Sequence, residues 1–334
     1  NPQNGEIYAM ANVPEYNLNE PFELTKKQQQ ADSKKQQEYL NQKWRNSCIN
    51  DTYEPGSVFK IITAAAGLES GKVKVTDHFN CPGFRIVEDR KIRCHKTTGH
   101  GSETFREGVM NSCNPVFMEV GARVGVDGMY DMFQKLGLFE KTGIDLPGEA
   151  NSIMHKKKNV KAVELATMSF GQSIQITPLQ LLRAASAAVN GGKLITPHFG
   201  VRAVSADGKE EKVFEYSEKK GVIQKETSET LRELLKAVVS EGSGRNCRID
   251  GFSIGGKTAT SEKLPRGNGK YISSFLGFSK AEDPTVMGIV LIDEPEGTYY
   301  GGTIAAPVMR SVFQVALPYL GISKDYTDSK ESRS

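Results

Sequence analysis

No stretch of this 334-residue chain is apolar over the length of a membrane-spanning helix, so the sequence predicts no segment inside a bilayer. A surplus of charge is also missing. The 43 Lys and Arg residues nearly balance the 40 Asp and Glu residues, and a net charge of +3 is too small to predict a nucleic-acid partner or a charged membrane surface. With 38% apolar and 25% charged residues, the composition is typical of a globular chain of one large or two ordinary domains.

The sequence shows no signal peptide. It opens on a turn, Asn1-Pro2-Gln3-Asn4-Gly5, and residues 5–13 then have the pattern of a strand. A chain that begins inside structure is expected to be an excised piece of a longer protein. The five cysteines are an odd number, so they cannot all pair with one another.

A turn followed by an apolar helix surrounds Ser57 and Lys60. Pro55-Gly56 favours a turn, and the residues after it, through Leu68, have the composition of a buried helix. Residues three apart share a face of a helix, so the Lys60 amine can reach the Ser57 hydroxyl. Burial lowers the pKa of a lysine, and a neutral amine can take the proton of an attacking serine. The helix start adds backbone N–H groups where an oxyanion would form.

By itself the Ser-x-x-Lys spacing is a weak signal, because about two such spacings are expected by chance in a chain of this kind. The second one here is Ser217…Lys220, which lies in a polar stretch with no apolar helix behind it. We interpret it as solvated surface. The case for Ser57 depends on its context and on the partners described next.

Two cysteines flank a predicted hairpin at 77–98. With a turn near 87–90, Cys81 faces Cys94 across the strands, and strand alternation puts Asp77 on the same side. Two thiolates would make a tetrahedral zinc site with nearby ligands chosen from Asp77, His78 and His95. A Cys81–Cys94 disulfide or two free thiols are the alternatives.

Two further stretches carry side chains suited to catalysis. Ser112 and Asn114 are predicted on a turn between helices, where a hydroxyl and a carboxamide suit proton transfer and amide binding. The strand-like stretch 252–261 contains Lys257-Thr258-Ala259-Thr260, and its glycines predict close approach of another backbone or a ligand. A literal Lys-Thr-Gly at 141–143 precedes no strand. His100, between two glycines, is interpreted as a loop residue near the cleft rather than as a ligand.

The other segments alternate between helix and strand patterns. Residues 25–45 are polar and are predicted to form a solvated helix or a loop. Thr177-Pro178 is a predicted helix start. Further helices are predicted at 103–111, 116–138, 179–190, 229–239 and 301–320, a hairpin at 194–213, and strands at 271–278 and 285–292.

Taken together and in this order, the three motifs resemble the Ser-x-x-Lys, Ser-x-Asn and Lys-Thr-Gly set of penicillin-binding proteins and serine β-lactamases. The chain resembles the transpeptidase domain of class B penicillin-binding proteins over roughly residues 1–320, with most likeness to sporulation-specific members and, through Cys81 and Cys94, to a zinc-binding clostridial variant. The stretches that carry the resemblance are 53–60, 99–101, 111–115, 142–149, 171–172 and 301–307. Two positions depart from the family pattern: Ala259, where the family has Gly, and Ser173, where relatives often have Gly.

The resemblance implies an α+β fold of the penicillin-binding protein and serine β-lactamase type. That fold has a five-stranded antiparallel sheet flanked by helices and joined to an all-helical subdomain. The expected domain covers residues 1–322, with the sheet part from 1–24 and 193–322 and the helical part from about 57–192. Residues 323–334 are expected to be a disordered tail.

The resemblance also implies a D,D-transpeptidase that cross-links peptidoglycan stem peptides through a Ser57 acyl-enzyme and is acylated by β-lactams. It implies catalytic roles for Ser57, Lys60, Ser112, Asn114 and Lys257. Lys60 would be the general base, and the N–H groups of Ser57 and Thr260 would form the oxyanion hole. The substrate-binding residues would be Gly171, Gln172, Thr258, Ala259 and Thr260. The Ala259 methyl is expected to narrow the cleft, alter β-lactam preference or slow acylation.

No cofactor is expected for catalysis, and a structural zinc ion is expected at Cys81, Cys94, His95 and Asp77. The family resemblance places the protein on the extracytoplasmic face of the membrane, anchored by an N-terminal helix absent from this chain. A glycosyltransferase of the SEDS type would be its membrane partner. The alternatives are a serine β-lactamase or D,D-carboxypeptidase, and a non-catalytic β-lactam or muropeptide sensor or scaffold.

Overall fold

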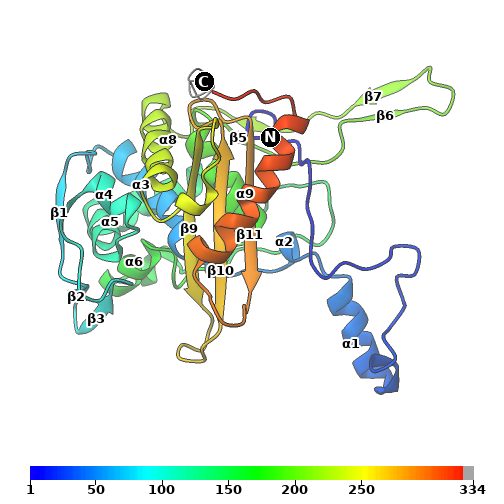
Figure 1. Cartoon of the computed structure of the whole chain (residues 1–334), viewed down its shortest axis with the longest axis horizontal. Coiled ribbons are helices and arrows are strands. Elements are labelled where there is room, and N and C mark those ends of the chain that lie inside the picture. Colours follow the sequence, from blue (N-terminus) through cyan, green and yellow to red (C-terminus); the bar gives the residue numbers. More distant parts are fainter. Residues whose placement is uncertain (326–334) are drawn as a thin grey trace, which may run out of the picture.

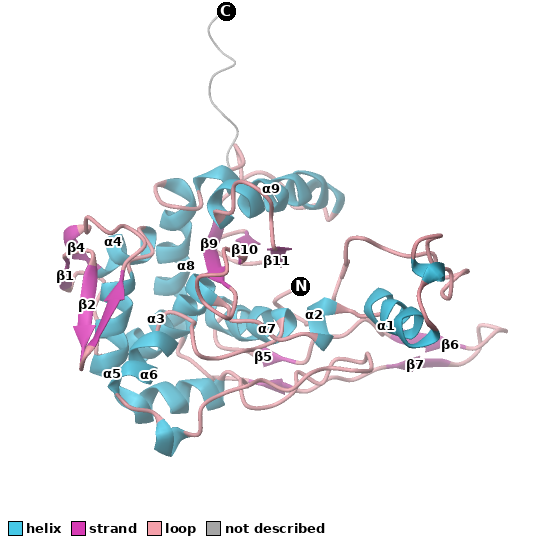
Figure 2. Cartoon of the chain, turned by 90° about the horizontal axis from the view of Figure 1, so that it is seen from below, coloured by secondary structure: helices cyan, strands magenta, loops and turns pink. Residues whose placement is uncertain are grey.

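The computed structural model describes residues 1–325, and in it a twisted antiparallel sheet lies beside a mostly helical part (Figure 1). In Figure 2 the C-terminal helix α9 covers one face of the sheet, and α7 and α8 lie on the other side. The α-helices are α1 (Ser33–Lys43), α2 (Ser47–Asn50), α3 (Lys60–Glu69), α4 (Phe105–Met110), α5 (Asn114–Lys135), α6 (Ala162–Met168), α7 (Pro178–Val189), α8 (Lys225–Ser240) and α9 (Gly301–Tyr319). The 3-10 helices are η1 (Gln28–Gln30), η2 (Gly56–Phe59), η3 (Lys157–Asn159) and η4 (Arg245–Cys247).

The central sheet consists of three long antiparallel strands in the order β11-β10-β9. Four short strand pairs lie outside it, namely β1 with β4, β2 with β3, β5 with β8, and β6 with β7. The strands are β1 (His78–Cys81), β2 (Phe84–Val87), β3 (Arg90–Arg93), β4 (Gly101–Thr104), β5 (Leu194–Ile195), β6 (Arg202–Val204), β7 (Glu211–Val213), β8 (Glu218–Lys219), β9 (Ile254–Glu262), β10 (Tyr271–Ser279) and β11 (Val286–Asp293).

The α+β fold class is confirmed, but within residues 1–325 the central sheet has three regular strands rather than five. Residues 5–13, expected to be a strand, contribute only an isolated parallel bridge from Glu6 to His198. The chain then leaves the sheet edge. Tyr8 is half exposed and Val13 is 94% exposed, while Ile7 and Met10 pack against a small cluster of Ile49, Ile144 and Leu179 away from the central sheet.

The glycines of β9 allow close approach of both a backbone and aromatic rings. A Cβ on Gly256 would meet the Phe275 ring at 2.5 Å and the Leu276 carbonyl oxygen at 2.7 Å, and one on Gly255 would meet the Phe278 ring at 2.2 Å. The expected close approach of another backbone is therefore present at Gly256, and aromatic side chains of β10 fill the rest of the space that these glycines leave open. The close packing fixes β9 along its buried length, which includes Lys257.

The helical part is built around α3, whose residues from Lys60 to Gly67 are all buried. This helix packs against α5, α7 and α8. A Cβ on Gly67 would lie 2.9 Å from Val120 of α5, so the two helices approach closely at that point. The N-terminus of α3 is consequently held rigidly where the chain enters it from η2.

The cysteine hairpin has the predicted turn but not the predicted pairing. Val87 pairs with Arg90 around a turn at Glu88, as expected. Cys81, however, belongs to β1 and pairs with Gly101 of β4, so it does not face Cys94 across one hairpin. Cys94 follows β3, and its N–H donates to the carbonyl of Gly83.

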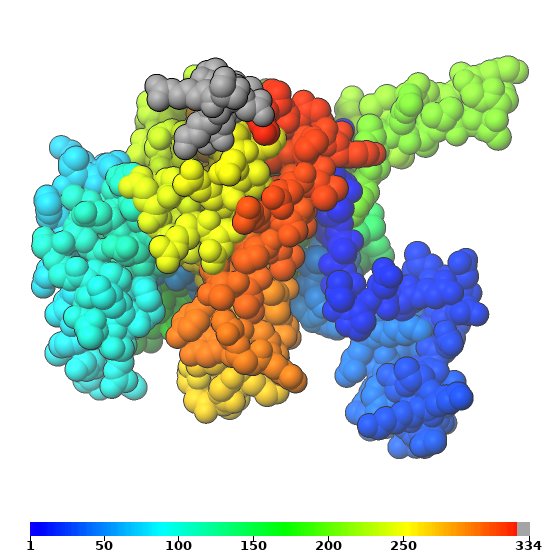
Figure 3. All heavy atoms as spheres, viewed as in Figure 1, coloured from blue at the N-terminus to red at the C-terminus, as the bar shows by residue number. Residues whose placement is uncertain are grey.

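Two segments project from the body of the molecule in Figures 1 and 3, the β6–β7 hairpin and the N-terminal arm that ends in α1. The predicted solvated helix within 25–45 is confirmed as α1, which buries no residue. The other helix predictions hold to within a few residues, and Thr177 caps α7 by accepting from the Gln180 N–H.

Of the tail predicted at 323–334, residues 326–334 lie outside the described residues. Asp325 is bonded to the body through the Ser253 N–H, 2.6 Å from its carboxylate. Across residues 1–325, the helices are all too short or too polar to cross a membrane.

Candidate active site

Ser57 lies on η2, the turn that delivers the chain into α3. The turn requires Gly56, whose φ of +54° is unfavourable for other residues. The Gly56 N–H donates to the Gly171 carbonyl at 2.9 Å, which ties the turn to the loop at 171–173. On its other side η2 packs against β9. Ser57 therefore lies between the start of α3 and β9, the strand that contains Lys257.

Lys60 is fully buried, and its amine has three polar partners from one turn. It donates to the Ser112 carbonyl at 2.7 Å, to the Ser112 hydroxyl at 3.2 Å and to the Asn114 side-chain oxygen at 2.8 Å. Burial lowers the pKa of Lys60 to about 8, and nearby Cys113, Cys94 and Glu103 oppose this shift.

Lys257 approaches the same hydroxyl from β9. Its amine lies 2.8 Å from the Ser112 hydroxyl oxygen, so Ser112 bridges the two lysines. Burial, reinforced by the charge of Lys60, lowers the pKa of Lys257 well below its usual range. Two buried amines sharing one hydroxyl cannot both remain charged at low cost, so this pair holds fewer than two protons near neutral pH.

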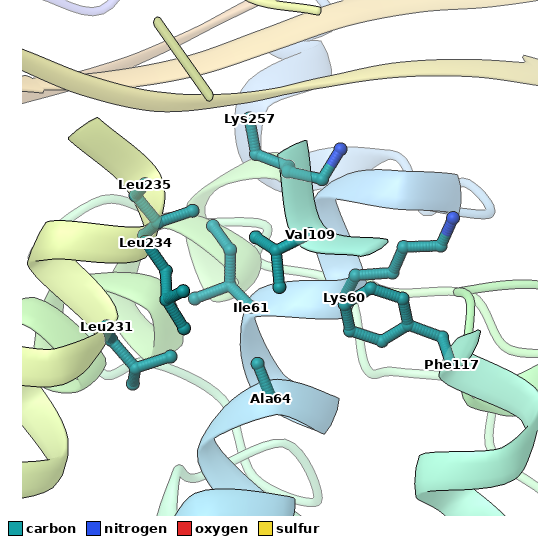
Figure 4. Close-up of a pocket in the computed structure, with 9 residues that line it drawn as sticks. All are labelled: Lys60, Ile61, Ala64, Val109, Phe117, Leu231, Leu234, Leu235 and Lys257. Carbon is teal, nitrogen blue, oxygen red and sulfur yellow. The ribbon is translucent and has the colours of Figure 1, made fainter. Parts of the chain in front are cut away.

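Apolar side chains surround the stems of both lysines (Figure 4). The two amines point the same way, and the Lys60 nitrogen lies 5.3 Å from the centre of the Phe117 ring. A small cavity with an apolar lining borders both lysine stems, and an apolar lining offers no polar partner to solvate a second charge. Its walls come from α3, α4, α5, α8 and β9, through Ile61, Ala64, Val109, Phe117, Leu231, Leu234 and Leu235.

The turn between α4 and α5 is strained at Ser112. Ser112 has φ +54°, which is rare for a residue with a side chain, and it is 7% exposed. Asn114 begins α5, and its side-chain amide donates to the Arg93 carbonyl at 3.1 Å. That bond orients the Asn114 oxygen towards Lys60.

The structure brings Lys60, Ser112, Asn114 and Lys257 into one hydrogen-bonded group. Ser57 makes no side-chain hydrogen bond to Lys60 within residues 1–325, because the Lys60 amine is directed at the α4–α5 turn. Proton transfer from Ser57 to Lys60 therefore stays a prediction.

The three residues after Lys257 alternate along β9. Thr258 shares a hydrogen bond with Ser243 at 3.1 Å, and the Thr260 hydroxyl oxygen accepts from the Gly301 N–H at 3.0 Å. Both hydroxyls can still donate to a carboxylate. Ala259 is 3% exposed, and its methyl faces Gly56 at the start of η2. The methyl is thus placed against the turn that presents Ser57, and its effect on rate stays a prediction.

A cluster of three thiols and one imidazole lies behind the α4–α5 turn. The ligand atoms of Cys81, Cys94, His100 and Cys113 lie within 4.8 Å of one another. The thiols are buried, and a hydrogen bond from Cys113 lowers the pKa of Cys94, which favours a thiolate. Described residues 1–325 contain no disulfide, so Cys81 and Cys94 are not joined.

The structure corrects the predicted ligand set, because Asp77 and His95 are outside this cluster. The Asp77 carboxylate accepts from Arg123 at 3.1 Å, which neutralises it elsewhere. His95 is exposed, and although its Nδ1 lies 3.8 Å from the Cys94 Sγ, it is not among the four residues whose ligand atoms lie close to one another. His100, interpreted from sequence as a plain loop residue, is the imidazole in the cluster instead.

Residues 1–314 match the family described as the penicillin binding protein transpeptidase domain. The chain belongs to this family. It is similar to the stage V sporulation protein D of Bacillus subtilis strain 168, with 41% identity over 328 residues that cover 96% of this chain and 49% of the relative. The chain therefore spans about half the length of that relative. It is also 33% identical to the probable peptidoglycan D,D-transpeptidase PenA of Neisseria flavescens, over 96% of this chain and 74% of PenA.

Solved structures of penicillin-binding proteins have the same fold as this transpeptidase domain. The transpeptidase domain of penicillin-binding protein 3 from Burkholderia pseudomallei gives a TM-score of 0.74 at 26% identity, covering 85% of this chain and 84% of that one. Penicillin-binding protein 3 of Mycobacterium tuberculosis, solved with ampicillin, gives a TM-score of 0.78 at 25% identity, covering 87% of this chain and 68% of that one. The α+β fold is thus confirmed as the penicillin-binding protein type.

Sequence reasoning missed two members of the thiol cluster. Cys113 lies between Ser112 and Asn114. Because these two neighbours were interpreted as catalytic, Cys113 was not considered as a metal ligand. Its position as the residue before α5, which turns its side chain inward, is the signal that was available. The missed His100 is six residues from Cys94 in sequence, and only the folded loop brings the two within 3.7 Å.

We predict that Gly171→Ala displaces the Ser57 turn. Gly171 has φ +82°, and a Cβ there would lie 2.1 Å from the Gly56 carbonyl oxygen. The matched control is Gly71→Ala, where φ is +66° but a Cβ would meet nothing within 4 Å. Chemical unfolding should show a loss of about 1 kcal/mol for the control and about 1–3 kcal/mol more for Gly171→Ala. Equal losses in the two variants would contradict this role for Gly171.

Proposed function

We propose that this domain is a serine D,D-transpeptidase that cross-links peptidoglycan stem peptides through an acyl-enzyme on Ser57. The observation that carries the proposal is the Ser112 hydroxyl between the amines of Lys60 and Lys257, at 3.2 and 2.8 Å. This arrangement would supply a base, a proton relay and a carboxylate-binding cation for the Ser57 nucleophile, whose turn packs against β9. Relatives named peptidoglycan D,D-transpeptidases support the choice of reaction.

In the first step the Ser57 oxygen attacks the carbonyl between the two terminal D-alanines, and its proton passes to the neutral Lys60 amine. The apolar surroundings of Lys60 favour that neutral form before the substrate arrives. The backbone N–H groups of Ser57 and Thr260 would stabilise the oxyanion. Asn114, which holds the Lys60 amine at 2.8 Å, would keep the base in place and bind a substrate amide.

The proton then moves from Lys60 through the Ser112 hydroxyl to the nitrogen of the leaving D-alanine, and the C–N bond breaks. Ser112 suits this relay because it contacts both amines and is almost fully buried. An amine from a second stem peptide later attacks the Ser57 ester, gives its proton back along the same path, and forms the cross-link.

The substrate carboxylate has a specific electrostatic role in this proposal. It would bind to Thr258, Thr260 and the Lys257 amine, and its negative charge raises the pKa of Lys257. A protonated Lys257 in turn keeps Lys60 neutral, since the two amines share the Ser112 hydroxyl. Substrate binding therefore places the one proton of the pair on Lys257 and prepares Lys60 as the base. Gly171 and Gln172 would line the opposite wall of the cleft.

A β-lactam imitates the D-Ala-D-Ala end and acylates Ser57 in the same way. The ampicillin complex of a similar penicillin-binding protein supports this extension. We predict that intact mass spectrometry after exposure to benzylpenicillin shows one covalent adduct, which Ser57→Ala abolishes because the nucleophile is gone. Ser217→Ala, in the second Ser-x-x-Lys spacing, is the matched control and should keep the adduct.

The same experiment separates the alternatives. An adduct that disappears within seconds, with release of hydrolysed penicillin, would indicate a β-lactamase or carboxypeptidase. Reversible penicillin binding without any adduct would indicate a sensor or scaffold. An adduct that survives Ser57→Ala would overturn the assignment of the nucleophile.

We further propose a structural zinc ion held by Cys81, Cys94, His100 and Cys113. The donor set fits, because three buried thiols and an imidazole within 4.8 Å of one another are typical of a closed tetrahedral zinc site. The Nδ1 of His100 also lies 3.8 Å from Glu103, whose Oε1 is buried without a partner in described residues 1–325, and the negative charge of this carboxylate would favour a cation beside it. Bound there, zinc would cross-link the cysteine loops to the Ser112 turn.

We predict about one zinc per chain by elemental analysis of protein purified without chelator. Cys94→Ser should lose the metal and lower the melting temperature, because the thiols then lose their shared cross-link. Cys247→Ser is the matched control, since Cys247 is equally buried but lies in a different hydrophobic cluster. Wild-type protein without zinc, or Cys94→Ser with its full content, would remove the zinc proposal.

The whole protein's setting follows from the family and is also a proposal. Peptidoglycan is outside the cytoplasm, so this domain would work on the extracytoplasmic face of the membrane, held there by an N-terminal anchor. A SEDS-type glycosyltransferase would make the glycan strand that this domain cross-links. Retention of the full-length protein in the membrane fraction would support the anchor. Co-purification with such a polymerase would support the partner.

A further inference from the structure

Glu54 is a nearly buried carboxylate three residues before Ser57, and the mechanism above gives it no task. Its side chain is 9% exposed. One oxygen accepts from the Ser173 N–H at 2.8 Å, and the other forms an ion pair with Arg266. Glu54 therefore touches two segments that are distant from it in sequence, the loop 171–173 and the loop 263–270 that joins β9 to β10.

The contact with Ser173 adds to a row of bonds that joins residues 53–56 to residues 171–176. Tyr53 and Ile176 exchange backbone hydrogen bonds at 3.1 Å, and the Gly56 N–H donates to Gly171 at 2.9 Å. The Glu54 carboxylate lies between these two bonds in sequence. It also stabilises Ser173 in the left-handed region, at φ +63°, where a residue with a side chain is strained.

The contact with Arg266 links Glu54 to the central sheet. Arg266 also donates to the Glu262 carbonyl at the end of β9, so its guanidinium joins Glu54 to the strand that contains Lys257. The β9–β10 loop lies at the lower end of the sheet in Figure 1. The other ion pairs of this loop, from Lys263 and Lys270, go to Asp293 and Glu294 near the end of β11 and stay within the sheet.

We propose that Glu54 is a positioning residue for the acylation of Ser57. Its carboxylate holds the turn that carries the nucleophile in register with the end of β9, through Arg266, and with the loop 171–173, through Ser173. A shift of that turn relative to β9 moves the Ser57 oxygen away from the groups that would bind the substrate carboxylate and the oxyanion. The inference rests on the proposed function, because it assumes that acylation of Ser57 is the reaction being positioned.

The test measures the rate of Ser57 acylation by benzylpenicillin in wild type, Glu54→Gln, Arg266→Gln and the double variant. Glu54→Gln keeps an oxygen for the Ser173 N–H and removes only the charge. Each single variant should slow the acylation step about fivefold, with little change in penicillin binding before that step, because the ion pair is partly exposed and of modest strength. The double variant should be no slower than the singles, since both changes break one contact.

Two controls separate positioning from general stability. Lys263→Gln removes ion pairs of the same loop that do not reach Glu54, and it should acylate within twofold of wild type. Raising the salt concentration should slow the wild type towards the variants and leave the variants unchanged, because salt screens a partly exposed pair. Arg266 is on a surface loop, so Arg266→Gln remains a valid probe if Glu54→Gln does not fold.

Wild-type rates in Arg266→Gln, or losses that multiply in the double variant, would overturn the inference and leave the proposed function standing. A wild-type protein that is never acylated would overturn the proposed function instead. The two failures are therefore distinguishable in one set of measurements.

Discussion

Two lysine amines buried in an apolar wall and sharing one serine hydroxyl are the constraint on which the rest of the site depends. Burial removes the solvation of either charge and lowers both pKa values, and the charge of Lys60 lowers the pKa of Lys257 further. The cost of burying Lys60 and Lys257 is offset by hydrogen bonds from the α4–α5 turn. Packing lowers the pKa of Lys60 to about 8, so a substantial neutral fraction exists near physiological pH, and this neutral amine can activate a serine hydroxyl as a nucleophile.

The fold serves this pair by fixing three segments against one another. The start of α3 supplies Lys60, the α4–α5 turn supplies Ser112 and Asn114, and β9 supplies Lys257. Close packing on α5 at Gly67 fixes α3, and the Phe275 ring against Gly256 fixes β9. The α4–α5 turn contains Cys113, which joins it to the thiol cluster. Glu54 belongs to the same framework, since its carboxylate joins the nucleophile turn to loops from both parts of the molecule. Catalysis by positioned groups requires such rigidity on the scale of a fraction of an ångström.

The sequence predicted the chemical groups better than their surroundings. Ser57 and Lys60 are one helical turn apart, and the helix at 114–135 and the strand at 254–262 follow from local patterns, so local rules were enough to find them. The strand predicted at residues 5–13 was wrong, because a strand pattern in the sequence does not show whether a partner strand is available to pair with it. The thiol cluster was half found, because Cys81 and Cys94 were treated as one hairpin while the fold brings them together from separate strand pairs. Glu54 and Arg266 are 212 residues apart, a distance over which no periodicity carries information.

The pH dependence of Ser57 acylation tests the central claim most directly, namely that a buried, neutral Lys60 is the base. Benzylpenicillin is a suitable reagent, because its carboxylate stays ionised across the range. The account predicts a rate that is low near pH 6 and rises to half its maximum at or below about pH 8, as Lys60, with a pKa of about 8, loses its proton. A rate that keeps rising beyond pH 10, as expected for a solvated lysine, or one that falls as the pH increases from 6 to 8, would contradict it.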